Sequence, residues 1–263
     1  MSHSLTLRRN ILLHKLAGRL PGFSWMSLVR LLPQSTNAWP RLPFAHPLRS
    51  EGGRTLFATP FGQMWAPPDE QAALGLTVLE MLANIYFHGP VQIHSGDVVL
   101  DMGANLGIFA LIALRHGATR VICFEANPQL VGCLQQTFAA EAASGKVVVV
   151  AAPLWSEEVP VKFGGDSLTG KIGESGAEVS AVTVDATCAR LGLDRVDFIK
   201  ADIEGAERHA LRGARQTLAR FAPKLALCIY HLPDDLEVIS AEVMASRPYQ
   251  TAVHASGDFL YGW

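Results

Sequence analysis

The sequence predicts an α/β protein with a doubly wound, mostly parallel, Rossmann-like sheet and an N-terminal extension. Two observations indicate this fold. Several apolar segments are continuous instead of alternating with polar residues, which is typical of parallel strands covered by helices on both faces. These segments also alternate along the chain with segments of helical periodicity. The 263 residues, 49% of them hydrophobic and 17% charged, are enough to bury a large core.

Residues 1–66 are expected to form the extension, and residues 67–263 the main domain. The first twenty or so residues have apolar positions near helical spacing, but charged residues interrupt them too early for a secretory signal or a membrane span. We therefore expect an amphipathic helix that packs on the main domain, or alternatively on a partner or a membrane surface, and no transmembrane segment. Residues 55–65 have the pattern of a β-hairpin, and PPDEQAALGLTVLEMLANIYFHG carries a helical pattern.

Strands and helices then alternate through the main domain. The expected strands are 98–101, 120–125, 147–151, 196–200, 224–230, 250–254 and 258–261. The expected helices are about 106–116, 128–141, 204–220 and 234–245. Only a short ASG turn separates the last two strands, so we expect them to pair as an antiparallel hairpin and to leave one reversed strand in the seven-stranded sheet.

Charge and cysteine content narrow the class of protein. The formal net charge of −2 provides no attraction for nucleic acid or for an anionic membrane surface. The four cysteines form no C-x-x-C pair, and Cys123 and Cys228 lie in predicted strands. We therefore expect buried free thiols and a cytoplasmic location.

A glycine-rich turn follows the first predicted strand, in the segment VVLDMGANLGIFAL. In an open α/β sheet, ligands bind outside the carboxyl ends of the strands. The first strand ends at Asp101, and Gly103 and Gly107 let a ligand approach the backbone beside the free N–H groups of the next helix. The second strand ends at Glu125, whose carboxylate can accept hydrogen bonds from both hydroxyls of a ribose.

The spacing of this turn distinguishes between two nucleoside cosubstrates. A dinucleotide site needs G-x-G-x-x-G, whereas here the spacing is G-x-x-x-G after Asp101. A carboxylate at this place repels a pyrophosphate but suits the ammonium group of an amino acid, directly or through water. S-adenosyl-L-methionine (SAM) has an amino acid end and a ribose end, so Asp101 and Glu125 together predict a SAM site. The spacing and the lack of a Y-x-x-x-K pair argue against an NAD(P)-dependent oxidoreductase.

Titratable side chains end two further predicted strands. The segment VDFIKADIEGAE brings Asp202 to the carboxyl edge of the sheet, beside the first strand, and LCIYHLPDDL brings His231 to the same edge. Asp202 or Glu204 can instead cap the next helix, with Glu207 completing a capping box. Lys200 is expected to pair with a carboxylate.

Four motifs in this order resemble the FkbM family of SAM-dependent methyltransferases, over roughly residues 75–263: VVLDMGANLGIFAL, VICFEANP, VDFIKADIEGAE and LCIYHLPDDL. The resemblance implies a class I methyltransferase fold with strand order 3-2-1-4-5-7-6. It also implies O-methylation of a hydroxyl on a sugar or a secondary metabolite, with Asp202 facing the transferred methyl group. By motif position, the SAM contacts are Asp101, Gly103, Asn105, Gly107 and Glu125.

Methyl transfer to a hydroxyl requires that the acceptor lose its proton, and two arrangements can achieve this. His231 can act as the base, with an unperturbed pKa near 6.5, while Asp202 orients either His231 or the acceptor. Alternatively, Asp202, Glu204 and His231 hold a divalent cation that lowers the pKa of the acceptor hydroxyl. His254, which ends the sixth strand, is a weaker candidate for a functional role.

A rival interpretation is a regulatory or interaction module that binds SAM without catalysis. Asp202 and His231 argue against it, because binding alone does not need two titratable groups at the methyl end. The sequence identifies neither the particular acceptor nor the oligomeric state. The expected partner is a small molecule with a hydroxyl group, and not nucleic acid. The glycine-rich segment 164–176 is predicted to be either a mobile lid over the site or a surface excursion.

Overall fold

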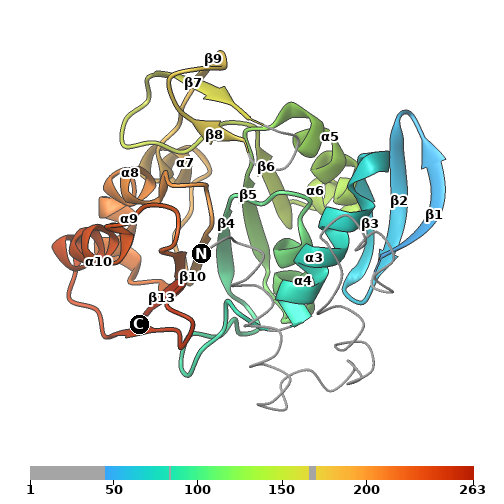
Figure 1. The fold of residues 1–263 in the computed structure, drawn as a ribbon. Coiled ribbons are helices and arrows are strands. Elements are labelled where there is room, and N and C mark those ends of the chain that lie inside the picture. The colour runs from blue at the N-terminus through green and yellow to red at the C-terminus, as the bar shows by residue number, and fades with distance from the viewer. Residues whose placement is uncertain (1–44, 83, 166–169) are drawn as a thin grey trace. The chain divides into compact units, whose positions relative to one another are not determined.

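The computed structural model of the protein describes residues 45–82, 84–165 and 170–263 (Figure 1). It divides into two compact units, Met1–Ile85 and Tyr86–Trp263. The predicted domain boundary between residues 66 and 67 stays a prediction. The amphipathic helix expected near the N-terminus lies outside the described residues.

The first unit contains a three-stranded antiparallel sheet with the order β1-β2-β3. Its strands are β1 (His46–Glu51), β2 (Arg54–Thr59) and β3 (Gly62–Ala66). The hairpin predicted over residues 55–65 is confirmed as β2 and β3. Strand β1 was not predicted, because all six of its residues are exposed and no apolar alternation marks it. A short 3-10 turn, η2 (Pro68–Glu70), leads into helix α3 (Gln71–Leu82), which fits the helical pattern of the sequence.

The second unit is built on the predicted seven-stranded sheet, whose order is β12-β13-β11-β10-β4-β5-β6. This is the predicted order 3-2-1-4-5-7-6, which is therefore confirmed. Strand β13 runs antiparallel to both β11 and β12, so the reversed strand is also where it was expected. The strands are β4 (Val98–Met102), β5 (Arg120–Phe124), β6 (Val147–Val150), β10 (Phe198–Ala201), β11 (Lys224–Cys228), β12 (Thr251–Val253) and β13 (Phe259–Gly262).

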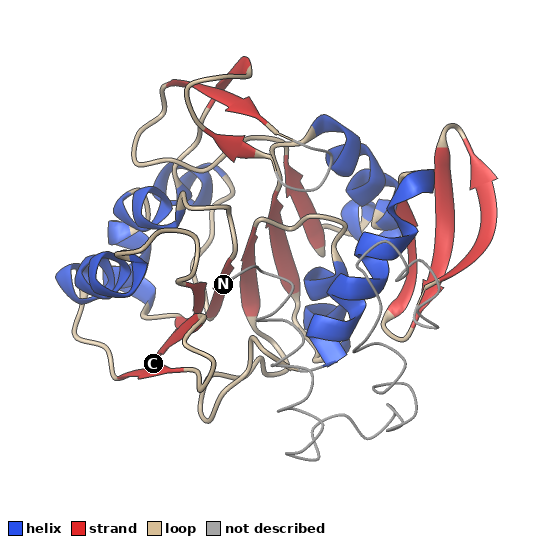
Figure 2. Ribbon diagram, in the orientation of Figure 1, coloured by secondary structure: helices blue, strands red, loops and turns tan. Residues whose placement is uncertain are grey.

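Helices cover both faces of this sheet (Figure 2). On one side lie α4 (Ile108–Arg115), α5 (Pro128–Thr137) and α6 (Ala139–Ala143). On the other side lie α7 (Val184–Arg190), α8 (Glu207–Arg212), α9 (Arg215–Phe221) and α10 (Asp235–Ser246). The main apolar core joins the sheet to this second group, through buried side chains such as Leu100, Leu211 and Ile239. On the first side, Phe109 of α4 packs against Phe198 of β10, with ring centroids 5.9 Å apart.

Two predictions about local structure were wrong or incomplete. The single helix expected over residues 204–220 is two helices, α8 and α9, which meet at Gly213 and Ala214. A side chain at Gly213 would overlap the carbonyl oxygen of Trp155, so glycine is required at this junction. A small antiparallel sheet of β7 (Pro160–Gly164), β8 (Lys171–Ile172) and β9 (Ala177–Ser180) was not predicted. It includes part of segment 164–176, and the lid role of that segment stays a prediction.

Two broader expectations can be compared with the structure. All four cysteines are buried and free, as predicted. Among the described residues, no helix combines the length and apolar character needed to cross a membrane.

Candidate active site

The carboxyl ends of four neighbouring parallel strands carry the predicted site residues. Strand β4 pairs with β5 on one side and with β10 on the other, and β10 pairs with β11. Asp101 belongs to β4, Glu125 follows β5, Asp202 follows β10, and His231 comes three residues after β11. The sheet therefore brings these four side chains to one edge, as the sequence predicted.

The glycine-rich turn after β4 has the left-handed backbone that its sequence requires. The φ angles are +78° at Gly103, +51° at Asn105 and +90° at Gly107. Protein atoms fill the space that a side chain would need at both glycines. A Cβ at Gly103 would overlap the backbone carbonyl of Asp202, and a Cβ at Gly107 would lie 2.6 Å from the ring of Phe138. The absence of a side chain at these glycines thus lets other parts of the protein pack closely against the turn. The contact of the two glycines with SAM stays a prediction.

Glu125 is hydrogen-bonded into this turn. Its Oε2 accepts the backbone N–H of Asn105 at 2.8 Å, and its Oε1 accepts the backbone N–H of Asn127 at 2.8 Å. Burial raises the pKa of Glu125, and the backbone hydrogen bonds from Asn127 and Asn105 act in the opposite direction. These bonds fix the carboxylate at the mouth of the turn.

Asp101 and Lys200 form a buried ion pair beneath the turn. The Asp101 side chain is fully buried, and its Oδ1 lies 3.1 Å from Nζ of Lys200. Lys200 Nζ also donates to the carbonyl oxygens of Gly103 and Met102, at 2.5 and 3.4 Å. Burial raises the pKa of Asp101 although Lys200 opposes this rise. The expected pairing of Lys200 with a carboxylate is confirmed, while the predicted contact of Asp101 with SAM stays a prediction.

Two tyrosine hydroxyls hold the carboxylate of Asp202. Tyr86 donates to Oδ2 at 2.8 Å, and Tyr230 donates to Oδ1 at 3.3 Å. Burial alone would raise the pKa of Asp202, but the charges of Lys200 and His231 and the hydrogen bond from Tyr86 lower it. Because 26% of the side chain is exposed, an ionised carboxylate is available at the surface of the site.

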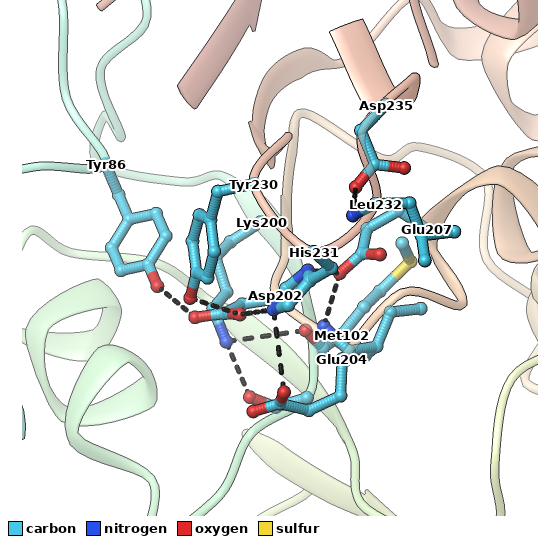
Figure 3. Close-up of polar contacts among 12 residues, drawn as sticks. Tyr86, Met102, Lys200, Asp202, Glu204, Glu207, Tyr230, His231, Leu232 and Asp235 are labelled. Carbon is cyan, nitrogen blue, oxygen red and sulfur yellow. Dashed lines mark hydrogen bonds and ion pairs between the residues drawn. The ribbon is translucent and has the colours of Figure 1, made fainter. Parts of the chain in front are cut away.

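His231 lies among three carboxylates (Figure 3). Its Nδ1 lies 3.1 Å from Oε1 of Glu207, and its Nε2 lies 3.5 Å from Oδ1 of Asp202 and 3.7 Å from Oε2 of Glu204. Burial of the ring opposes its charge, but Glu207, Asp202 and Glu204 raise the pKa of His231 to about 9. The pKa of His231 therefore lies above the unperturbed value near 6.5, and the cationic form of the ring is favoured at neutral pH.

The helix-capping interpretation is wrong for Asp202 and Glu204. Helix α8 begins at Glu207, with Ala206 as its N-cap and no side-chain cap hydrogen bond, so neither Asp202 nor Glu204 caps it. The carboxylate of Glu207 instead accepts the backbone N–H of Ile203 at 2.7 Å. Glu204 has a left-handed φ of +56°, which is unusual for a residue other than glycine.

The residues around His231 also include the ligands predicted for a divalent cation. Among the described residues, Asp202, Glu207 and His231 have potential ligand atoms within 4.8 Å of one another, so Glu207 takes the place predicted for Glu204. However, the two ring nitrogens of His231 face different carboxylates. This arrangement suits an imidazolium with a proton on each nitrogen better than a metal ligand with a free lone pair. We derive no step through a metal ion.

The sequence analysis missed two tyrosines at this edge, and His254 follows a different strand. Tyr86 and Tyr230 were not predicted; Tyr230 is adjacent to His231, whereas Tyr86 lies in a turn without any pattern that marks it. His254 follows β12 at the far end of the sheet, where its Nδ1 lies 2.8 Å from Oγ of Ser256. Strands β13 and β11 separate β12 from β10, and the ring of His254 lies beside the rings of Phe259 and Tyr261. A functional role for His254 stays a prediction.

The sheet order, with acidic side chains at the carboxyl ends of β4, β5 and β10, defines a Rossmann-like protein of the class that binds a nucleoside cosubstrate at this edge. Comparison with known families makes the class specific. A family model described as the methyltransferase FkbM domain matches residues 101–253, which is more than half of the chain. The chain belongs to the FkbM methyltransferase family, as the motifs predicted.

The chain is also similar to one curated protein by sequence and to one solved structure by fold. The chain is 26% identical over 167 residues to the 31-O-demethyl-FK506 methyltransferase FkbM of Streptomyces tacrolimicus, a match that covers 49% of this chain and 63% of the relative. It also resembles the crystal structure of methyltransferase FkbM from Methylobacillus flagellatus KT, with a TM-score of 0.54 and 22% identity. That match covers 74% of this chain and 55% of the other. The chain thus spans less than two thirds of either protein.

Proposed function

We propose that the protein transfers a methyl group from SAM to a hydroxyl of a small molecule, such as a glycan or a secondary metabolite. One observation carries this proposal: in a chain of the FkbM family, Asp202 and His231 meet at the strand edge beside a turn that holds Glu125. The name of the Streptomyces relative supports O-methylation, because it describes an enzyme that acts on 31-O-demethyl-FK506. A cytoplasmic location is part of the proposal, since all four cysteines are free and buried.

In this proposal, Glu125 accepts the ribose hydroxyls of SAM. Its two oxygens already accept backbone N–H groups, which fix their direction, and a carboxylate has further lone pairs for hydroxyl donors. The N-terminus of α4 follows this turn and offers backbone N–H groups to a ligand, whereas the N–H groups from Gly103 to Gly107 already bond oxygen atoms of the protein. Asp101 acts on the amino acid end of SAM through water, because its own carboxylate is buried against Lys200.

The chemical step is an in-line displacement at the methyl carbon of SAM. The acceptor oxygen forms a new bond to this carbon, the bond between carbon and sulfur breaks, and its electron pair stays on sulfur. Asp202 accepts a hydrogen bond from the acceptor hydroxyl and orients it, since the two tyrosines hold the carboxylate in place. The hydroxyl proton passes to His231 in the fraction of molecules whose ring is neutral.

Direct binding and methyl transfer test the proposal separately. Calorimetry with SAM should show saturable binding, and tritium from methyl-labelled SAM should appear in hydroxyl-bearing small molecules of an extract. Asp202→Asn and His231→Gln should bind SAM but lose transfer. Binding without transfer to any acceptor would favour the silent module, whereas a thermal shift with NADPH and none with SAM would favour the oxidoreductase.

A further inference from the structure

Glu207 is a charged side chain at this site that the proposed reaction does not use. Its side chain is fully buried in the first turn of α8. Oε1 accepts the N–H of Ile203, whereas Oε2 has no hydrogen-bond partner among the described residues. Nδ1 of His231 lies 3.1 Å from Oε1, which is an ion-pairing distance, but neither ring nitrogen of His231 forms a hydrogen bond to the described residues. A buried ionised carboxylate destabilises a protein unless it is paired. Within the described part of the chain, the cationic side chain at ion-pairing distance from Glu207 is His231.

The neighbouring cations are already paired elsewhere. Arg208, the next residue in α8, forms ion pairs at 2.7 Å with Asp234 and with Asp235. Lys200 pairs with Asp101. Because neither cation reaches Glu207, the orientation of the His231 ring depends on Glu207 at Nδ1 and on the groups that face Nε2.

We propose that Glu207 is a positioning residue whose charge pairs with the Nδ1 side of the His231 ring, so that Nε2 faces Asp202 and the acceptor hydroxyl. This inference rests on the proposed function. A carboxylate on one ring nitrogen fixes which nitrogen keeps its proton and stabilises the imidazolium that forms during proton transfer. The proton that enters and leaves is then the one on Nε2, which is where the acceptor proton has to go.

The proposal determines the pH dependence of the reaction. The charged and titratable groups around the ring are Glu207 of α8, Asp202 and Glu204 of the loop after β10, and the phenol of Tyr230, whose ring centroid lies 4.2 Å from that of His231. His231 accepts a proton only when it is neutral. With a pKa of about 9, the neutral fraction of His231, and with it kcat/KM, rises with pH, has its midpoint at about pH 9 and levels off above it.

The variant Glu207→Gln keeps the shape of the side chain and removes its charge. We expect the pKa of His231 to fall toward its unperturbed value near 6.5, because the neutral amide no longer favours the imidazolium. The midpoint of the pH profile should move down with it. The value of kcat at the plateau should fall by about 10²-fold while KM for SAM changes little, because the ring loses its fixed orientation.

Two further variants separate positioning from a structural role. Glu207→Asp keeps the charge, so the profile midpoint should stay near that of the native protein while kcat falls less than in Glu207→Gln. Glu242→Gln is the matched control, since Glu242 is 12% exposed and bonds Arg212 and Arg215 in a different part of the unit. It should lower the melting temperature and leave kcat and the midpoint unchanged.

Histidine titration by ¹⁵N NMR, with His231→Gln to assign the signal, gives the pKa and tautomer without turnover. An unchanged pKa of His231 in Glu207→Gln would overturn the inference, as would a loss of kcat with an unmoved midpoint. If no acceptor is ever methylated, the proposed function fails, but the NMR titration still decides whether Glu207 controls His231.

Discussion

The buried ion pair between Lys200 and Asp101 allows a quantitative prediction. Lys200→Met replaces the cation with an apolar side chain of similar length. It leaves the fully buried Asp101 without its charged partner, and it removes the donor to the carbonyl oxygens of Gly103 and Met102.

The size of the effect follows from the distance. Two unit charges 3.1 Å apart attract each other by about 5 kcal/mol at an effective dielectric constant of about 20. Removing one partner of a buried pair generally costs about 3–5 kcal/mol. Protonation of Asp101 limits the loss, so we expect the free energy of unfolding of Lys200→Met to fall by about 3 kcal/mol at neutral pH. This is a large part of the stability of a typical domain, which is about 5–15 kcal/mol.

The loss should also depend on pH. Burial already raises the pKa of Asp101, and without Lys200 it rises further above the unfolded value near 3.9. A folded state with a raised pKa gains stability as pH falls, so the deficit of Lys200→Met should shrink between about pH 8 and about pH 5.

Urea unfolding over this range measures the loss, and Asp101→Asn combined with Lys200→Met is the control. The double variant should be more stable at neutral pH than Lys200→Met, because no charge is left unpaired. A loss below about 1 kcal/mol, or one that is the same at every pH, would refute the reasoning.

Three further predictions concern the turn and the cluster. Glu125→Gln should weaken SAM binding by about 10-fold or more in calorimetry, because a neutral amide replaces a charged acceptor; unchanged affinity would remove Glu125 from the SAM site. Gly107→Ala should lower the free energy of unfolding by about 1–3 kcal/mol, since its Cβ would meet Phe138 and φ is +90°; an unchanged urea midpoint would contradict the packing argument. Exhaustive chelation should leave methyl transfer unchanged, whereas activity lost with EDTA and restored by Mg²⁺ or Mn²⁺ would support the metal hypothesis for Asp202, Glu204 and His231.

The sheet was predictable because its strands carry a strong signal. Buried parallel strands are continuous apolar runs, and helices of clear periodicity separate them. The elements that the sequence missed lack this signal. Strand β1 is exposed along its whole length, and the small sheet of β7, β8 and β9 contains short strands with mostly exposed residues. Such strands form through backbone pairing, which side-chain patterns do not record.

The site residues that directly follow a strand could be predicted from the sequence. The residues that only tertiary contacts bring to the site could not be predicted as well. Asp202 and His231 follow adjacent strands, so topology alone places them together. Tyr86 reaches Asp202 across 116 residues of sequence, and nothing near it in the chain indicates that contact. The motif around Glu207 also fits a capping box, and its carboxylate does bond the backbone N–H of Ile203. The contact of Glu207 with His231 could not be predicted from the sequence, because the fold brings the two residues together.

The ion pairs of this edge link the two ends of the proposed reaction. Lys200 bonds the carbonyl of Gly103 in the turn proposed to hold SAM, and its charge also lowers the pKa of Asp202 at the acceptor end. Asp202 in turn contributes to the charge of His231, which Glu207 holds from the other side of the ring. Negative and positive side chains alternate along this series. Such buried charges favour a single arrangement of the side chains, because moving any one of them leaves its neighbour unpaired in a medium of low dielectric constant. The stability lost in Lys200→Met would therefore come from the same set of charges that we propose to serve the reaction.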